Sequence, residues 1–466
     1  MDCCRYRCAR MGPGYEVGNG RNCQILVRND ISDGRLDRGA MTHAWTWVFW
    51  LGVAWLGYVY AGYPALLWCA GLLMPRSAPC GDPDSPKVSV LLSARNEQKD
   101  IGWKIAETLG WDYPAEKLEV LVASDASDDN TDEILKGVSD PRFRYIRLEP
   151  RRGKNEALNQ LNEIATGELL FFSDANSHIE PSCVGRMVRH FADPKVGCVT
   201  GVERTIRDGE DSAVTTGTRA SLGYEALVNE LESRLGSVLV CDGSIFCIRR
   251  SLFHRLQPDL ANDLELPLYI GAAGQKILFD PSIVSLERST SSPREEFNRK
   301  RRICGQGILG MWRLQRCLRG LRAWQFFSRK LLRWFGAVPL VMILVSCAML
   351  AANPFFRVVL ALQAIFYGLA MAGWWSAARQ RPGGSLTAFP FFFVLVHVAA
   401  LVGVVEAGFG RRFSVWDSAV QSRGPGATSV ASASSVAATK AAVIASGVEI
   451  LAAIPDSYAE LHSGKR

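Results

Sequence analysis

Residues 168–180 constrain the fold of this chain more than any other segment. A short apolar run, 169–172, ends abruptly in Ser173-Asp174-Ala175-Asn176. This pattern predicts a buried strand of an α/β sheet, and such sheets bind their ligands at the carboxyl ends of their strands. Side chains two residues apart in an extended segment point the same way, so Asp174 and Asn176 can share one hard cation. The segment therefore predicts a metal-assisted site for a nucleotide diphosphate.

The flanking sequence alternates between predicted strands and predicted helices, which is typical of a parallel sheet. The predicted strands are 88–92, 118–125 and 142–148, and the predicted helices are 97–109, one opening near 129 and one opening near 155. The following region, 196–287, has a mixed α+β pattern. It predicts a hairpin over 238–248, a helix from 262 and a strand over 275–279.

Apolar runs surround this region. Residues 44–74 exceed the length needed to span a bilayer, and three further runs lie near 335–352, 355–377 and 388–409. Hydrophobic residues make up 48% of the 466 residues, yet the net charge is +7, which fits a membrane protein whose basic residues face the cytoplasm. The thirteen cysteines include no C-x-x-C pair, so neither a zinc site nor a disulfide framework is predicted.

These features divide the chain into six parts. They are a disordered upstream extension (1–40, with Met41 as the expected natural start), a transmembrane helix (41–75), a catalytic domain (76–305), an interfacial amphipathic segment (306–334), three apolar membrane segments (335–410) and a flexible tail (411–466). The interfacial segment alternates Trp and Leu with Arg, as a helix among lipid headgroups does, and an ordinary solvated helix is the alternative. Arginines flank the last apolar run on both sides, so the side of the membrane on which the tail lies stays open, and one run could be re-entrant.

Six short motifs occur in an order and spacing that resemble a known family. They are S-A-R-N-E (93–97), D-A-S-D-D-N-T (125–131), G-K-N-E-A-L-N (153–159), S-D-A-N (173–176), N-D-L-E-L (262–266) and R-K-R-R-I (299–303). With the membrane segments, they resemble the membrane-bound enzymes of glycosyltransferase family 2, the relatives of cellulose, chitin, hyaluronan and poly-N-acetylglucosamine synthases. The resemblance implies an α/β GT-A (Rossmann-like) catalytic domain inserted between transmembrane helices. It also implies a nucleotide-sugar donor, expected to be a UDP-sugar, and Mg²⁺ or Mn²⁺.

The resemblance assigns donor-side roles to several residues. Asp174 and Asn176 would bind the metal, although the family more often has Asp at the second position, and a strand-end aspartate that caps a turn is the alternative. Asp125 would contact the nucleoside, with helix capping by Asp125 or Ser127 as the alternative. Lys154 would meet a phosphate as a point charge, or be a solvated lysine.

Further donor contacts come from two other motifs. Ala94, Asn96 and Glu97 would approach the base through backbone groups. Arg299 and Arg302 stand where processive members carry Q-x-x-R-W, and Arg302 could hold the diphosphate through bidentate hydrogen bonds. Losing both the Gln and the Trp makes processive synthesis a weaker expectation than sugar transfer, and a membrane-phosphate role for the arginines is the alternative.

On the acceptor side, a carboxylate must take a proton from the attacking hydroxyl. Asp263 matches the family's base, although Asn262 replaces the acid that usually precedes it. Helix capping by Asp263 is the alternative, and Glu265 is the fallback base. Asp242 and Gly243 are expected to border the acceptor pocket.

The leading hypothesis is an inverting, metal-dependent transferase acting on a polysaccharide or glycolipid acceptor. We expect it to be a multi-pass protein of the plasma (inner) membrane with a cytosolic catalytic domain and lipids as partners. A polyprenyl-phosphate acceptor is one alternative, and a non-enzymatic, nucleotide-sugar-sensing membrane protein is another. Nucleic acid is not an expected partner, because the basic residues cluster beside membrane spans.

Overall fold

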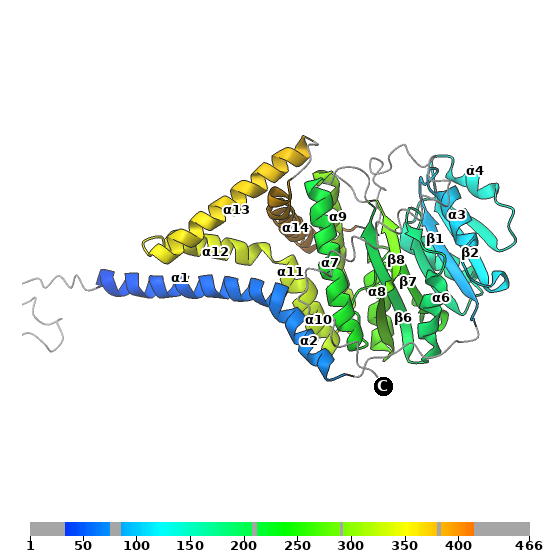
Figure 1. Ribbon diagram of the computed structural model, residues 1–466, viewed down its shortest axis with the longest axis horizontal. Coiled ribbons are helices and arrows are strands. Elements are labelled where there is room, and N and C mark those ends of the chain that lie inside the picture. Colours follow the sequence, from blue (N-terminus) through cyan, green and yellow to red (C-terminus); the bar gives the residue numbers. More distant parts are fainter. Residues whose placement is uncertain (1–32, 75–84, 207–211, 289–291, 380–383, 414–466) are drawn as a thin grey trace, which may run out of the picture.

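The computed structural model describes residues 33–74, 85–206, 212–288, 292–379 and 384–413 (Figure 1). Most of the predicted N-terminal extension (1–32), most of the linker after the first apolar run and almost all of the tail lie outside these residues, whereas the last part of the extension, 33–40, is helical and not disordered as predicted. The described chain forms a sheet domain with helices on both faces and a group of helices that project from its side.

The sheet has eight strands in the order β3-β2-β1-β4-β7-β6-β8-β5. Their bounds are β1 Val88–Ala94, β2 Leu118–Asp125, β3 Phe143–Leu148, β4 Leu169–Asp174, β5 His178–Ile179, β6 Val196–Thr205, β7 Ile245–Arg249 and β8 Lys276–Glu287. Strands β1 to β4 are parallel, as the βαβ pattern predicts, whereas β7 runs antiparallel to both β4 and β6. The result is a mixed α/β sheet.

Both faces of the sheet are buried, which explains why its central strands are apolar along their whole length. Val88, Val90 and Leu92 of β1 face one core, while Leu91 faces the other. The first core is closed by α3 (Ile101–Leu109), α4 (Thr131–Lys136) and α6 (Cys183–Arg189). The second is closed by α5 (Lys154–Ile164) and α8 (Asn262–Ala272). Short 3-10 turns complete the domain: η2 Ala115–Lys117, η3 His190–Ala192 and η4 Arg250–Leu252.

The hairpin predicted over 238–248 is wrong. Only its second half forms a strand, β7, which pairs with β4 and β6. The first half instead crosses the start of β8, where the Val238 N–H donates to the Ile277 carbonyl, and then meets α8 through the Cys241 N–H and the Asp263 carbonyl. Tertiary partners on both sides therefore replace the local pairing that the sequence pattern suggested.

Two long helices link the sheet to the projecting group. They are α7 (Ala213–Arg234) and α9 (Pro293–Arg313), and both lie between the sheet and α14 (Ser385–Gly408) in Figure 1. Cys304 and Ile308 of α9 share one apolar cluster with Ala400 and Val404 of α14. This contact ties the last apolar helix to the sheet domain.

The described residues contain two helices long and apolar enough to cross a membrane, α13 (Pro354–Ala378) and α14. A third candidate is a pair bent by 55°, formed by 321–334 and α12 (Ala337–Met349), which could be a broken span or a re-entrant loop. The three C-terminal apolar runs are thus helices as predicted, and one of them has the bent form that the charge pattern left open.

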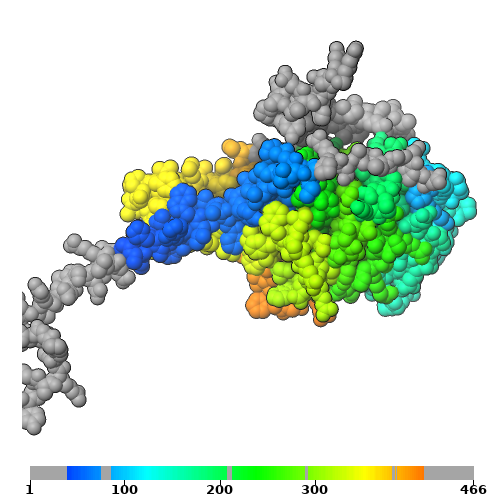
Figure 2. All heavy atoms as spheres, turned by 90° about the horizontal axis from the view of Figure 1, so that it is seen from below, coloured from blue at the N-terminus to red at the C-terminus, as the bar shows by residue number. Residues whose placement is uncertain are grey.

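The predicted N-terminal span is helical but is not among these candidates. It comprises α1 (Asp33–Gly57), a π-helical stretch η1 (Tyr58–Gly62) and α2 (Tyr63–Leu72). Frequent Trp, Tyr and Gly residues and a charged start reduce its mean hydropathy. By length and composition, the candidate spans among the described residues therefore follow the sheet domain, and the prediction that spans flank it on both sides is wrong. The helix nevertheless packs beside α12 and α13, and Phe49 meets Phe355 and Phe356 edge-on. In both views α1 (blue) and α12–α13 (yellow) project together from the sheet domain (Figure 1 and Figure 2).

The predicted interfacial segment, 306–334, begins in the last part of α9 and continues as α10 (Leu321–Gln325), η5 (Phe326–Leu331) and α11 (Leu332–Trp334). Its apolar side chains Leu321 and Phe327 are exposed, whereas Leu314, Phe326 and Trp334 are buried. Its cations, however, do not all point outward. Arg329 is buried and pairs with Glu225 and Glu232 of α7 at 2.5 and 2.7 Å, because a charge buried under α7 requires partners inside the protein.

A glycine tests the contact between α9 and α14. A Cβ at Gly403 would lie 2.1 Å from the Arg301 carbonyl oxygen, so Gly403→Ala must push the two helices apart. We expect a loss of about 1–3 kcal/mol of stability, measured as a lower thermal unfolding midpoint of the detergent-solubilised protein. Gly368→Ala in α13 is the control, because a Cβ there meets nothing within 4 Å. Equal midpoints for the two variants would contradict this packing.

Candidate active site

A pocket lies at the edge of the sheet where β1, β2 and β4 end. These strands are parallel neighbours, and Ala94 pairs with Ser124 while Ser93 pairs with Asp174, so their carboxyl ends meet. The pocket is lined by Ser93, Arg95, Glu97, Asp125, Arg151, Gly153, Lys154, Asp174, Ala175 and Asn176. Five of these were predicted as donor-site residues from the sequence: Glu97, Asp125, Lys154, Asp174 and Asn176.

An ion pair occupies the centre of the pocket. The Lys154 Nζ lies 2.5 Å from Asp174 Oδ1. Gly153 precedes the lysine at a φ of +90°, a conformation that favours glycine, and α5 begins immediately afterwards. Burial alone would lower the pKa of Lys154, but Asp174 and Asp263 outweigh it and raise the pKa above its ordinary value. Lys154 is therefore a fixed, charged group in the pocket.

Asp125 is buried, and its carboxylate holds the loop that leads to Lys154. Oδ1 accepts the backbone N–H of Arg152 at 2.7 Å, and Oδ2 accepts that of Gly153 at 2.9 Å. Neither Asp125 nor Ser127 caps the next helix, because the N-cap of α4 is Asn130 and makes no side-chain cap. The carboxylate still lines the pocket, and each of its oxygens has a second lone pair for a nucleoside hydrogen bond.

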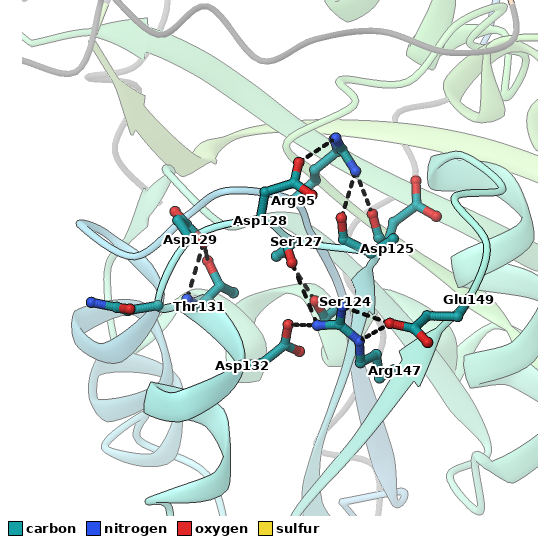
Figure 3. Close-up of polar contacts among 12 residues, drawn as sticks. Arg95, Ser124, Asp125, Ser127, Asp128, Asp129, Thr131, Asp132, Arg147 and Glu149 are labelled. Atoms are coloured by element: carbon teal, nitrogen blue, oxygen red, sulfur yellow. Dashed lines mark hydrogen bonds and ion pairs between the residues drawn. The ribbon is translucent and has the colours of Figure 1, made fainter.

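The loops after β1 and β2 are joined by hydrogen bonds (Figure 3). The Arg95 guanidinium donates to the carbonyls of Asp125 and Ala126 at 2.9 and 2.7 Å, and it pairs with Asp128. Asn96, at a φ of +55°, accepts the Asp128 N–H at 2.9 Å. Arg95 belongs to the S-A-R-N-E motif, but the sequence analysis predicted no role for its side chain.

This bracing limits how the 94–97 segment can contact a base. The backbone N–H groups of Asn96 and Glu97 already donate to Ser127 and Thr131, at 3.2 and 2.8 Å. Of the three residues predicted here, Glu97 lines the pocket, whereas Ala94 ends β1 and Asn96 bonds to the loop after β2.

Asp263 lies in the first turn of α8, next to the 241–243 segment. The Cys241 N–H donates to the Asp263 carbonyl at 2.9 Å, and a Cβ on Gly243 would lie 3.4 Å from Asp263 Oδ2. The N-cap of α8 is Ala261, so Asp263 does not cap its helix. Burial raises the pKa of Asp263, while the nearby cation of Lys154 lowers it in part. The structure thus brings together three predicted residues, Asp242, Gly243 and Asp263.

Glu265, the fallback base, is differently placed. Its carboxylate accepts the backbone N–H of Gln257 at 3.1 Å, and burial raises its pKa to about 7. This buried carboxylate holds the 257 loop against α8, which is a structural role.

The two predicted phosphate-binding arginines of α9 have different surroundings in the structure. Arg299 pairs with Glu296 one turn earlier, at 2.8 Å. Arg302 is influenced by the charges of Asp263 and Asp174, although burial and the neighbouring Arg299 lower its pKa. The charges of Asp263 and Asp174 thus act on Arg302, whereas Glu296 and Glu203 are the carboxylates that act most on Arg299.

Three acidic residues, Glu203, Asp242 and Glu287, lie together beside the pocket. The sequence analysis did not predict this cluster. Asp242 accepts the Glu203 N–H at 2.8 Å and the Ser244 hydroxyl at 2.7 Å. Burial raises the pKa of Asp242, Glu203 and Glu287. Repulsion from Glu203 adds to this rise for Asp242 and Glu287, while Arg299 partly offsets it for Glu203 and Glu287. Glu203 and Glu287 lie on β6 and β8, whose pairing no local pattern reveals.

The donor set of the pocket fits a hard divalent cation that is shared with a substrate. Asp174 supplies a carboxylate and Asn176 an exposed amide, and Asp174 already holds one cation, the Lys154 ammonium. Within the described residues, no group of three or more His, Cys, Asp or Glu side chains could hold a metal by itself. Mg²⁺ characteristically uses one or two carboxylates and completes its shell with phosphate oxygens and water, so the residues present suit that use.

Comparison with known protein families gives one family match. The model described as Glycosyl transferase family 2 matches residues 89–257, which include β1, β4 and the pocket. Asp263 and the arginines of α9 lie beyond the matched segment.

Curated relatives resemble the same part of the chain. A probable glycosyltransferase, YdaM of Bacillus subtilis, is 27% identical over 214 residues, covering 44% of this chain and 51% of its own length. A beta-monoglucosyldiacylglycerol synthase of Trichormus variabilis is 26% identical, covering 42% and 44%. A poly-beta-1,6-N-acetyl-D-glucosamine synthase of Staphylococcus epidermidis is 33% identical, covering 25% and 28%. The chain thus spans about half or less of the length of these relatives.

Among solved structures, a mannosyltransferase from Pyrobaculum calidifontis superposes with a TM-score of 0.59 at 22% identity. The match covers 76% of this chain and 99% of that one, and it confirms the GT-A-like fold.

Asp125→Asn tests how the loop is held. An amide would turn an N–H group toward one of the two backbone N–H donors and leave that donor unpaired, which costs about 1–3 kcal/mol. We expect roughly tenfold weaker binding of a nucleoside diphosphate, measured by isothermal titration calorimetry of the full chain in detergent. Asp128→Asn is the control, since that side chain is 75% exposed. Equal losses in both variants would contradict a specific role for Asp125.

Proposed function

Residues 89–257 match glycosyltransferase family 2, and from this premise we propose that the chain transfers a sugar from a nucleotide-diphosphate sugar to an acceptor at the membrane. The proposed reaction inverts the anomeric carbon in a single displacement and requires Mg²⁺ or Mn²⁺. The expected donor is a UDP-sugar, and the expected acceptor is a glycolipid or a growing saccharide.

The observation that carries the proposal is the ion pair of Lys154 with Asp174 at the carboxyl end of β4. The Lys154 ammonium contacts Asp174 at 2.5 Å, and the charge of Asp263 also acts on it. A reaction that expels a diphosphate and deprotonates an acceptor needs a carboxylate for a metal on one side and a basic carboxylate on the other. Asp174 and Asp263 supply these two groups around one cation.

On the donor side, Asp174 and Asn176 would hold the divalent cation, which when bound stabilises negative charge on the departing diphosphate. Lys154 and Arg302 would bind phosphate oxygens, and Arg299 would support Arg302 from the preceding turn of α9. Asp125 and Glu97 would contact the nucleoside from the ends of β1 and β2, with Ala94 and Asn96 behind them. The P. calidifontis mannosyltransferase, which shares the fold, was solved with GDP-mannose and Mn²⁺, and this supports a nucleotide sugar and a metal as the ligands to test.

On the acceptor side, Asp263 would accept the proton of the attacking hydroxyl. Its raised pKa makes it a stronger base than an exposed aspartate once it is ionised. Asp242 and Gly243 would border the acceptor, with Gly243 leaving open the approach to the Asp263 carboxylate. Because the sugar would meet only one nucleophile, the acceptor hydroxyl, a single displacement follows.

We further propose a multi-pass location in the plasma (inner) membrane with the sheet domain on the cytosolic side. Large apolar side chains are exposed along the projecting helices, among them Trp47, Trp50, Val358, Leu362 and Ile365. An exposed apolar surface of this extent suits lipid rather than water. In this proposal α1 and α2 share the lipid environment of α13, against which α1 packs.

The acceptor is the least constrained part of the proposal. The relatives include a glycolipid synthase and a polysaccharide synthase by name. Arg299-x-x-Arg302-Ile303 lacks the Gln and Trp of processive members, which favours a limited number of transfers over long polymer synthesis. Nucleotide sugars should be screened with membrane-embedded protein, with and without Mn²⁺, by following release of the nucleoside diphosphate. Labelled product that extracts into organic solvent would indicate a lipid acceptor, including a polyprenyl phosphate, and long insoluble product would indicate a polysaccharide.

Asp263→Asn tests the base. We expect kcat/KM for transfer to fall by about 10²–10⁴-fold, because general-base catalysis is lost. The base acts when deprotonated, so wild-type kcat/KM should rise with pH through the raised pKa of Asp263 and level off above it.

Glu265→Gln is the matched control on the same helix. The amide oxygen can still accept the Gln257 N–H, so transfer should stay within a few fold of wild type. Undiminished transfer by Asp263→Asn would instead favour a non-enzymatic sensing role for the site or another base.

A further inference from the structure

The turn that carries Asp174 and Asn176 rests on a buried ion pair from a different element. Lys104 and Glu107 lie on α3, behind the edge of the sheet, with the Lys104 Nζ 3.1 Å from Glu107 Oε2. The Lys104 side chain is completely buried and lies over the Trp111 ring at 5.6 Å, while that of Glu107 is 14% exposed. Neither residue lines the donor pocket.

Both members of this pair bond to the backbone of the turn. The Lys104 Nζ donates to the Ser177 carbonyl at 2.7 Å, and the Ile179 N–H donates to Glu107 Oε1 at 3.0 Å. Ser177 in turn donates its hydroxyl to the Asp174 carbonyl at 2.8 Å. A chain of three hydrogen bonds and one ion pair therefore connects α3 to the backbone of Asp174.

Fold stability alone gives no reason for this arrangement. Burying two charges is costly, and replacing a buried ion pair by apolar residues of similar volume is often neutral or stabilising. Apolar residues, however, cannot form hydrogen bonds with the Ser177 carbonyl and the Ile179 N–H of the turn. The charges of Lys104 and Asp174 also act on each other, since Asp174 partly opposes the lowering of the Lys104 pKa that burial causes.

We propose that Lys104 and Glu107 are positioning residues that fix the 174–179 turn so that Asp174 and Asn176 present their oxygens to the divalent cation. This rests on the proposed function, because it assigns the metal to Asp174. The pair acts through the turn and touches neither the metal nor the sugar. Partners that orient metal ligands commonly change metal affinity by 10–100-fold when they are removed, and the same range is expected here.

The test compares the full chain in detergent with the double variant Lys104→Met/Glu107→Leu, which removes both charges together and leaves no unpaired ion. Mn²⁺ binding is measured directly, by the loss of the free Mn²⁺ electron paramagnetic resonance signal in the presence of UDP. We expect the Mn²⁺ dissociation constant to be 10–100-fold higher in the double variant. The Mn²⁺ concentration that gives half-maximal transfer should rise by the same factor. The transfer rate at saturating Mn²⁺ should fall much less, because the catalytic groups are unchanged.

Thr108→Val is the matched control. Thr108 is buried on the same helix, and its hydroxyl donates to the Lys104 carbonyl at 2.7 Å without reaching the turn. It should leave the Mn²⁺ dissociation constant unchanged, and a change equal to that of the double variant would show that α3 matters only as packing. The thermal unfolding midpoint is recorded for every variant, and the single variant Lys104→Met replaces the double variant if the latter does not fold.

The outcomes separate this inference from the proposed function. If wild type binds Mn²⁺ and a folded variant binds it equally well, the positioning role is overturned and the metal assignment stands. If wild type itself neither binds Mn²⁺ with UDP nor needs it for transfer, both are overturned. Weaker Mn²⁺ binding confined to the Lys104 and Glu107 variants supports the inference.

Discussion

The ion pair between Lys154 and Asp174 is the contact on which the organisation of the pocket depends. A carboxylate at the end of a buried strand needs a cationic partner, and the first residue of α5 provides one at 2.5 Å. To place that lysine, the preceding loop turns through Gly153 and is held by the Asp125 carboxylate. The ends of β2 and β4 and the start of α5 are thereby fixed relative to one another.

The same principle, a buried charge held by several partners, joins the sheet domain to the projecting helices. Glu232 of α7 accepts hydrogen bonds from the Tyr63 hydroxyl, the Arg329 guanidinium and the Leu239 N–H, at 2.5, 2.7 and 2.9 Å. These donors come from α2, from η5 and from the segment that leads to Asp242 and Gly243. One carboxylate thus connects the N-terminal helix and the amphipathic segment to the part of the site proposed to bind the acceptor.

Local sequence patterns correctly predicted the elements whose formation depends mainly on neighbouring residues. The 118–125 strand was predicted with the bounds it has, and the βαβ alternation predicted the parallel pairing of β1 to β4, because burial on both faces requires continuous apolar runs. The hairpin over 238–248 failed for the opposite reason. Its first half alternates like a strand, but Ile277 and Asp263 offer backbone partners from distant parts of the chain. Likewise, the arginines beside the membrane segments suggested lipid phosphates, yet Arg329 finds its counter-charges on α7.

The sequence by itself determined the strand-end positions of Asp125 and Asp174 and the glycine before Lys154, because runs, turns and helix starts are local properties. It also determined that the chain carries long apolar helices after its sheet domain. Only the tertiary structure decided which charges face one another. It paired Lys154 with Asp174, assembled Glu203, Asp242 and Glu287 into one acidic group, and bonded Lys104 to the Asp174 turn. Those groupings depend on strand order and helix packing, which join residues far apart in the chain, and no spacing along the sequence records such contacts.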